Sequence, residues 1–368
     1  MKHLTTFVVV TALSASACCK KTPPPVAPQP EPIAVVEPVA PAPDPEAEKA
    51  KAEAERVAKE KAEAEAKAAE DKRKQAEALA KAYAEFEADT AKEAARWTAE
   101  LKKSATQLVS KAYPNPKAAL TAILKSPVRV PGHADRDAHR HPLETLTFFG
   151  IKQNMAVIEM GAGEGWYTEI LGAFLAKAGK FFVVSADPNG PADSGRTLYG
   201  KRTHAILAKS PELFGKAAPV VVNPPDSLSL GADGSVDMVL AVREMHNWHR
   251  RKMVAAYLKS IHNVLKPGGV LGVVAHRAVA GTNADDTAPK GYLPEQWLIE
   301  TIEAAGFKLA AKSEINANPK DTKDYADGVW TLPPNYAAGE TDKAKYTAIG
   351  ESDRMTLRFV KVAAPAAK

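Results

Sequence analysis

"VIEMGAGEGWYTEI", residues 157–170, joins a short apolar run to a glycine-rich loop and then to a helix-like pattern. A strand, then Gly161, Gly163 and Gly165, then a helix would bring unpaired backbone N–H groups to one point and let a ligand approach the backbone closely. Such a turn suits a nucleoside or an anionic group. The alternative is a tight strand-to-helix turn that binds no ligand.

The glycine spacing separates two classes of nucleotide site. Dinucleotide-binding loops have their third glycine one residue later, where it allows the helix to pack tightly on the strand. This chain has Trp166 at that position, and an acidic residue, Glu159, stands two residues before the first glycine. The resulting GxGxG spacing disfavours a nicotinamide-dependent oxidoreductase.

Apolar runs alternate with helical patterns through the rest of this region. Strands are expected at 156–160, 180–187, 219–223, 235–242, 269–276, 307–315 and 355–362. Helices are expected at 141–150, 165–177, 249–265 and 293–306. This alternation predicts parallel βαβ units in a doubly wound α/β sheet, with the site at the carboxyl ends of the strands.

The motifs VIEMGAGEG, DGSVDMVLA and LKPGGVLGVV, in this order, resemble those of class I S-adenosylmethionine-dependent methyltransferases. The resemblance covers residues 113–362. It implies a Rossmann-like sheet of seven strands, mostly parallel with the last strand antiparallel, and S-adenosyl-L-methionine as the cofactor. The segments 136–150, 245–248 and 350–361 resemble a group of predicted bacterial methyltransferases, many of them exported. This resemblance does not indicate the methyl acceptor.

The resemblance also implies which residues hold the cofactor. Asp187 matches the acidic residue that accepts hydrogen bonds from the ribose, and Asp226 matches the residue that contacts the adenine amine. For both, the alternative is an ordinary loop carboxylate, and for Glu159 it is a structural hydrogen-bond acceptor. The cofactor-binding set is Glu159, Gly161, Gly163, Gly165, Asp187 and Asp226.

Methyl transfer needs an oriented acceptor and, where necessary, a base that removes its proton. The segment REMHNWH, residues 243–249, follows the fourth strand, where such groups would be useful. His246 is the candidate base because imidazole titrates near neutral pH. Asn247 could hydrogen-bond the acceptor, and Trp248 could form an apolar or cation-binding wall. The alternative is that His246 merely caps the following helix.

Two further segments attract attention. HADRDAHRH, residues 133–141, is dense in imidazoles and carboxylates, but its alternation of Arg with Asp favours an ion-paired lid over a metal site, and no metal is expected. NPPD, residues 223–226, follows the third strand, whereas the NPPY-type motif of amino methyltransferases belongs after the fourth. We interpret it as a rigid loop beside the adenine pocket.

The N-terminal third of the chain is not globular. Residues 1–17 have the charged, apolar and small-residue order of a signal peptide, and the run SASACC resembles a bacterial lipoprotein signal with the lipid on Cys18, or alternatively on Cys19. Residues 18–45 are a proline-rich linker, and residues 46–105 form a solvated Ala/Glu/Lys-rich helical stalk rather than a coiled-coil seam. These features predict a membrane-anchored lipoprotein facing the periplasm, or alternatively a secreted protein.

The charge and cysteine content exclude other classes. The net charge of +5 is spread along the chain without interleaved aromatic residues, so nucleic acid is not expected as a partner. No cysteine follows Cys19, which excludes disulfides and thiolate zinc sites downstream. The leading hypothesis is an envelope-anchored methyltransferase acting on an unidentified small molecule. The alternative is a non-catalytic envelope lipoprotein that keeps the fold as a binding or structural module, because the cofactor is a cytoplasmic metabolite.

Overall fold

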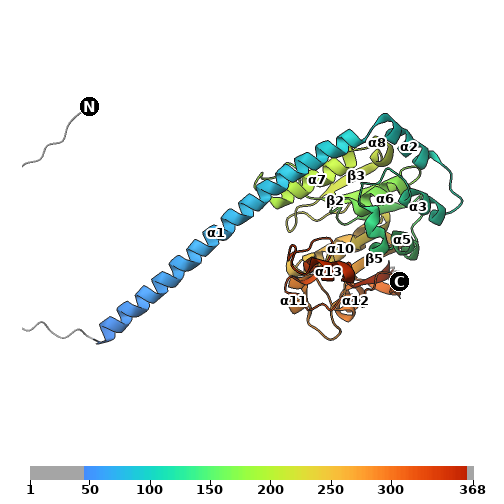
Figure 1. The fold of residues 1–368 in the computed structure, drawn as a ribbon. Coiled ribbons are helices and arrows are strands. Elements are labelled where there is room, and N and C mark those ends of the chain that lie inside the picture. Colours follow the sequence, from blue (N-terminus) through green and yellow to red (C-terminus); the bar gives the residue numbers. More distant parts are fainter. Residues whose placement is uncertain (1–44, 363–368) are drawn as a thin grey trace, which may run out of the picture. The chain divides into compact units, whose positions relative to one another are not determined.

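The computed structural model describes residues 45–362, whose centre is a seven-stranded sheet with the order β3-β2-β1-β4-β5-β7-β6 (Figure 1). The strands are β1 Ala156–Glu159, β2 Lys180–Ser185, β3 Ala217–Val221, β4 Val236–Val242, β5 Leu265–His276, β6 Phe307–Ser313 and β7 Arg354–Lys361. Only β7 pairs antiparallel with its neighbours among the described strands. The predicted fold class is confirmed.

The direction of the strands decides which residues share an edge. Strands β1 to β5 pair in parallel, so their carboxyl ends lie at one edge of the sheet. Strand β7 begins at that same edge, because its first residue Arg354 is the partner of His276, the last residue of β5. We call this the carboxyl edge.

Helices cover both faces of the sheet (Figure 1). One face packs against α2 Ala99–Ser110, α3 Pro116–Leu124, α5 Pro142–Phe149, α6 Trp166–Leu175 and α8 Pro211–Phe214, and α7 Gly195–Ala208 lies against β2 and β3. The other face packs against α9 Met245–Arg250, α10 Val254–Val264 and α12 Glu295–Ala304. Alternate residues of β1 enter the two cores, since Val157 belongs to the first and Ile158 to the second. This explains why the strand is apolar up to Glu159.

Short elements complete the description. They are the α-helices α4 Asp137–Arg140, α11 Ala284–Thr287 and α13 Lys343–Ile349, and the 3-10 helices η1 Ala134–Arg136, η2 Ala288–Lys290 and η3 Gly328–Thr331. Most of them connect elements near the carboxyl edge.

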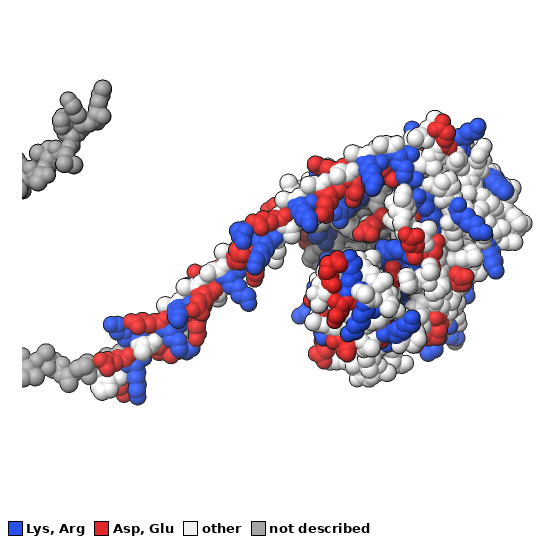
Figure 2. Space-filling view, in the orientation of Figure 1, with Lys and Arg blue, Asp and Glu red and all other residues white. Residues whose placement is uncertain are grey.

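A long helix, α1 Pro45–Arg96, precedes the domain, as predicted. Basic and acidic side chains alternate along it (Figure 2). Arg56 pairs with Glu53 at 2.6 Å and with Glu60 at 2.5 Å, and Arg73 repeats this pattern with Glu70 and Glu77. Such pairs support a helix that has no apolar stripe.

The chain divides into two units between Lys67 and Ala68, and the second unit contains the end of α1. Within it, Arg202 donates a hydrogen bond to the carbonyl of Ala82, and Lys209 forms an ion pair with Glu93 at 3.2 Å. This part of the helix therefore packs on the domain.

The helix expected through residue 105 ends at Arg96. The reason is Trp97, which is only 6% exposed and enters the core on the α6 side of the sheet. Thr98 then caps the next helix, α2, because its side-chain oxygen accepts a hydrogen bond from the N–H of Leu101. Two helices thus replace the single one expected.

The helix expected over 249–265 is also divided. It becomes α9 and α10, separated at 251–253, where Lys252 adopts a positive φ of 57°. Strand β5 begins at Leu265, four residues before the expected start, because Val236 of β4 already pairs with Leu265. The irregular register that follows accommodates the Lys-Pro-Gly-Gly turn within the strand.

The predicted signal peptide, the lipid site at Cys18 or Cys19 and almost all of the proline-rich linker lie outside the described residues. Across residues 45–362, none of the helices combines the length and the apolar character needed to cross a membrane.

Candidate functional site

The candidate site is the carboxyl edge, where four segments from distant parts of the sequence meet. They are the glycine loop after β1, the segment 243–249 after β4, the end of β5 at His276 and the start of β7 at Arg354. Parallel sheets of this kind bind ligands at this edge.

The glycine loop leaves room on its outer side. Gly163 and Gly165 have positive φ values of 56° and 88°, which favour glycine. A Cβ at Gly163 would meet nothing within 4 Å, whereas a Cβ at Gly161 would lie 2.8 Å from the hydroxyl of Tyr199 and 3.3 Å from a carboxylate oxygen of Glu244. Gly163 therefore presents an open backbone, and Gly161 allows two side chains to come close.

Tyr199 and Glu244 belong to the site, although no role was predicted for either residue. The Tyr199 hydroxyl accepts a hydrogen bond from the N–H of Gly163 at 3.3 Å. Burial raises the pKa of Glu244 to about 7, against the opposing effects of Asn247 and Arg243. No motif marks Tyr199, which reaches the loop from α7, and Glu244 stands within the predicted segment without a distinguishing neighbour.

Glu159 is positioned to organise the loop. Its side chain is buried, with 4% exposed, and accepts a hydrogen bond from the Thr168 hydroxyl at 2.8 Å. Burial raises its pKa to about 8, opposed by the Thr168 bond and assisted by Glu244. This arrangement favours the structural alternative, in which Glu159 ties β1 to α6 without touching a ligand.

Asp187 and Asp226 follow two neighbouring strands, β2 and β3, at the carboxyl edge. Both are exposed. Asp187 accepts a hydrogen bond from the N–H of Asn189 at 2.9 Å, and Asp226 lies in a turn closed by the bridge between Asn223 and Ser227. Their carboxylates are thus free to accept hydrogen bonds from hydroxyl or amino groups.

His246 lies in α9 with only 6% of its surface exposed. Its ring is 5.6 Å from that of His276 and 6.0 Å from that of Trp330, measured between centroids. Burial, then Arg250 and Arg243, lower its pKa to about 4, so the imidazole is neutral near physiological pH. The N-cap of α9 is Glu244, and His246 has no capping role.

The two residues after His246 differ in their surroundings. Asn247 hydrogen-bonds the Glu244 carboxylate, which holds that side chain beside the glycine loop. Trp248 is 2% exposed and stacks on Tyr257 with 4.4 Å between ring centroids. Its indole fills the core between α9 and α10, so the structure offers it no surface on which to form the predicted wall.

His276 completes the buried edge beside His246. Its Nδ1 lies 2.6 Å from the hydroxyl of Ser352, and burial, with His246 as the next cause, lowers its pKa well below the ordinary value. Ser352 stands just before β7, and its position could not be inferred from sequence because the segment before it is irregular.

The segment 133–141 is ion-paired, as its alternating charges favoured. Asp137 pairs with Arg129, which also contacts Glu169 at 2.9 Å, and His133 lies 3.1 Å from the same Glu169. Within residues 45–362, no three His, Cys, Asp or Glu side chains converge in a way that could hold a metal ion.

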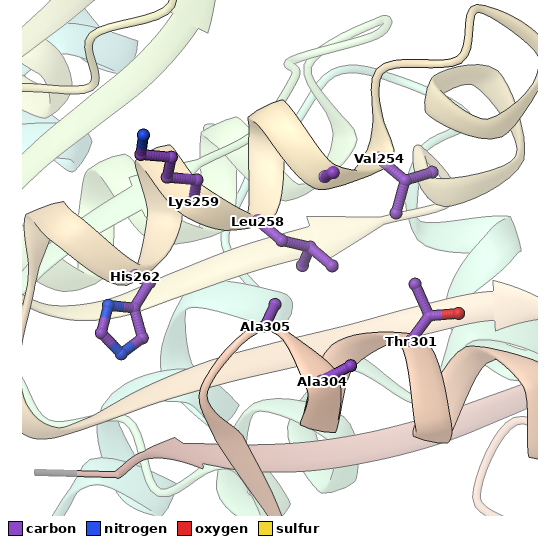
Figure 3. A pocket seen from close by; sticks show the side chains of 8 residues that line it. Val254, Leu258, Lys259, His262, Thr301, Ala304 and Ala305 are labelled. Carbon is purple, nitrogen blue, oxygen red and sulfur yellow. The ribbon is translucent and has the colours of Figure 1, made fainter. Parts of the chain in front are cut away.

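A separate groove of about 550 Å³ lies between α10 and α12 (Figure 3). It is lined mainly by small and apolar side chains, with Lys259 and His262 at one end. None of its lining residues belongs to the carboxyl edge, so the groove is distinct from the candidate site.

The edge fits S-adenosylmethionine on three observations. The backbone of Gly163 is open to a ligand, Gly161 admits no larger residue without displacing Tyr199, and the carboxylates of Asp187 and Asp226 are exposed at the ends of adjacent strands. In this arrangement the glycine loop would hold the cofactor's central part, and the two aspartates would accept hydrogen bonds from its ribose and adenine.

Comparison with known proteins supports this fit. Residues 158–273 match the model of a protein family described as a methyltransferase domain. No curated protein matches the chain. The match supports S-adenosylmethionine as the cofactor, as predicted.

Two solved structures are among those similar to this chain. A SAM-dependent methyltransferase from Aquifex aeolicus is 16% identical, with 66% of this chain and 98% of that chain covered and a TM-score of 0.40. The 1,6-didemethyltoxoflavin-N1-methyltransferase of Burkholderia thailandensis, with bound S-adenosylhomocysteine, is 17% identical, with 69% and 93% covered and a TM-score of 0.37. The strand order is that of a Rossmann-like methyltransferase fold, and residues 158–273 match a methyltransferase domain.

Proposed function

We propose that this protein transfers a methyl group from S-adenosylmethionine to a small molecule and works in the bacterial cell envelope. The observation that carries the proposal is that the open Gly163 backbone and a buried, neutral His246 both follow parallel strands at one edge of the sheet. The first feature suits the cofactor, and the second suits removal of a proton from the acceptor.

The bound cofactor supplies a methyl group activated by its sulfonium. The chain's own residues then have two tasks, which are to orient the acceptor and to take up its proton. His246 is neutral and can accept a proton at its imidazole, and the packing of α9 on the sheet fixes its position. Asn247 assists by holding Glu244 beside the glycine loop.

Calorimetric titration of the purified chain with S-adenosylmethionine tests the cofactor assignment. Binding is expected, and no binding at millimolar ligand would contradict it. The Asp187→Ala variant should weaken binding by roughly 1–3 kcal/mol, the scale of a hydrogen bond to a charged group. Unchanged affinity in that variant would remove Asp187 from the cofactor site.

Turnover separates the enzyme from the non-catalytic alternative. Formation of S-adenosylhomocysteine should be followed while a broad panel of small acceptors is offered to the full chain. Product with at least one acceptor supports the methyltransferase. Ordinary cofactor affinity without product across the panel would instead support an envelope lipoprotein that uses the fold only for binding.

The envelope location rests on the run SASACC and the proline-rich linker after it. We infer that a lipid on Cys18 anchors the chain in the membrane, with the domain in the periplasm. Radioactive palmitate should label the wild-type protein and not the Cys18→Ser variant, while Cys19→Ser should keep its label. Labelling of Cys18→Ser but not of Cys19→Ser would move the lipid to Cys19, and a protein found only in the medium would contradict the anchor.

A further inference from the structure

Three arginines gather around one buried carboxylate at the carboxyl edge. The nearest contacts to Glu351 are 3.0 Å from Nε of Arg136, 3.0 Å from Nε of Arg140 and 2.8 Å from Nη1 of Arg354. Glu351 is 5% exposed, and Arg140 and Arg354 are each 3% exposed. One carboxylate therefore pairs with three guanidinium groups in a largely buried environment.

A fourth arginine joins them from the end of β4. Arg243 has a positive φ of 61°, which turns the chain from the strand into α9, and the residue is partly exposed. It forms no ion pair with any residue in the described part of the chain. Its charged neighbours are Glu351, Arg354 and Arg136, and burial together with these two arginines lowers its pKa. We call Arg136, Arg140, Arg243 and Arg354 the arginine cluster.

The nearby carboxylates do not balance this charge. Glu164 of the glycine loop is 3.6 Å from Arg136 but is 77% exposed, and burial keeps the neighbouring Glu244 partly protonated near neutral pH. Two nitrogens, Nη2 of Arg140 and Nε of Arg354, are buried without a hydrogen-bond partner. Buried guanidinium groups are stable when an anion pairs with them, and their planar donors suit an oxyanion with two oxygens.

We propose that the arginine cluster binds a carboxylate carried by the methyl acceptor, so that the substrate is an acidic small molecule. The inference rests on the proposed function and deepens it. Arg243 is the contact residue, because it is partly exposed and its side chain is unpaired, and Arg136 assists from its place beside Glu351. His246 lies only three residues after Arg243. The rest of an acceptor whose carboxylate is bound by Arg243 would therefore lie next to the base.

Calorimetry on the full chain saturated with S-adenosylhomocysteine tests the proposal, with succinate as the probe and the uncharged succinamide as its control. Succinate should bind and succinamide should not. Arg243→Met should weaken succinate binding about tenfold or more, the loss of one charge-assisted contact, and leave the affinity for S-adenosylhomocysteine unchanged. Lys308→Met removes one charge from an exposed residue at the opposite end of the sheet and should change neither affinity.

Three results would overturn the proposal. These are no succinate binding by the wild-type protein at millimolar concentration, equal binding by Arg243→Met, or succinate binding only without S-adenosylhomocysteine together with a weakened cofactor affinity in Arg243→Met. The last result would assign the cluster to the cofactor's own carboxylate. If S-adenosylhomocysteine does not bind at all, the proposed function fails. The anion site is tested separately, because succinate binding by the wild-type protein that is lost in Arg243→Met would still show it. Arg136→Met provides a second variant should Arg243→Met melt at a lower temperature.

Discussion

His246 is the side chain on which the proposed chemistry depends most. Replacing it with alanine should lower turnover about a hundredfold or more, the usual contribution of a general base, without changing cofactor affinity. Steady-state kinetics and calorimetry measure the two quantities separately. His262→Ala, in the groove between α10 and α12, is a matched control that should keep full activity. Equal turnover in His246→Ala and wild type would rule His246 out as the base.

The pH dependence of turnover should report the environment of His246. The imidazole accepts a proton only when neutral, so activity should be lost as the pH falls through about 4, and not through the ordinary 6.5. Arg250→Met removes the largest electrostatic cause of the lowered pKa and should move this acid limb to higher pH. Arg251→Met removes an equal charge that is not among those causes and should leave the limb in place. A wild-type limb near 6.5, or no movement in Arg250→Met, would contradict the assignment.

The lowered pKa of His246 also makes folding stability depend on pH. The unfolded chain takes up a proton on His246 below its ordinary pKa of 6.5, while the folded chain does so only near 4. Folding stability should therefore decrease as the pH falls through this interval. The acid limb of turnover must be measured where the protein is still folded.

Glycine is required at position 161 because neighbouring side chains lie close to it, and not because of its backbone conformation. Gly161→Ala would place a Cβ 2.8 Å from the Tyr199 hydroxyl, and such overpacking should cost about 1–3 kcal/mol in the free energy of unfolding. Gly195→Ala, which meets nothing within 4 Å, is the matched control. Adding Tyr199→Phe removes the clashing hydroxyl and should restore part of the loss. Urea unfolding of the four proteins measures these effects, and equal stability of Gly161→Ala and Gly195→Ala would refute the packing argument.

Single residues were predictable where a local pattern marks them. The glycine loop and the segment 243–249 are contiguous and follow strands, so their place at the carboxyl edge could be inferred. Tyr199, Glu351 and Arg354 could not be, because they reach the edge through the packing of α7 and the reversal of β7. The sequence separates Arg140 from Glu351 by 211 residues, and only the folded sheet brings them together.

At the scale of elements, Trp97 determines where α1 ends. Its indole is buried, and its Nε1 donates a hydrogen bond to Glu93 at 3.0 Å. Trp97→Ala should lower the free energy of unfolding by about 3 kcal/mol, the cost of emptying an aromatic core position. Val57→Ala, at a position within α1 that is 50% exposed, should change it by less than about 0.5 kcal/mol. Equal stability of the two variants would show that α1 does not depend on this contact.

All seven expected strands are present, whereas the two longest expected helices, over 46–105 and 249–265, are each divided in two. A strand buried on both faces is mostly apolar, as residues 156–158 of β1 and the core of β5 are, and such runs stand out in the sequence. The end of a helix depends on tertiary contacts. The Ala/Glu/Lys composition continues through Trp97 without interruption, and only the burial of that side chain ends α1.

At the scale of the whole molecule, the proposed location of the protein differs from the compartment in which its cofactor is made. A signal peptide would export the chain, whereas S-adenosylmethionine is made in the cytoplasm. If the protein is active in the envelope, the form purified from membranes should carry S-adenosylmethionine or S-adenosylhomocysteine, which mass spectrometry of the denatured protein can detect. A form without residues 1–17, retained in the cytoplasm, is the positive control, and Asp187→Ala in both forms should lower the amount of bound ligand. Ligand in the cytoplasmic form alone would mean that the exported domain does not meet its cofactor, and the non-catalytic alternative would then be the better account.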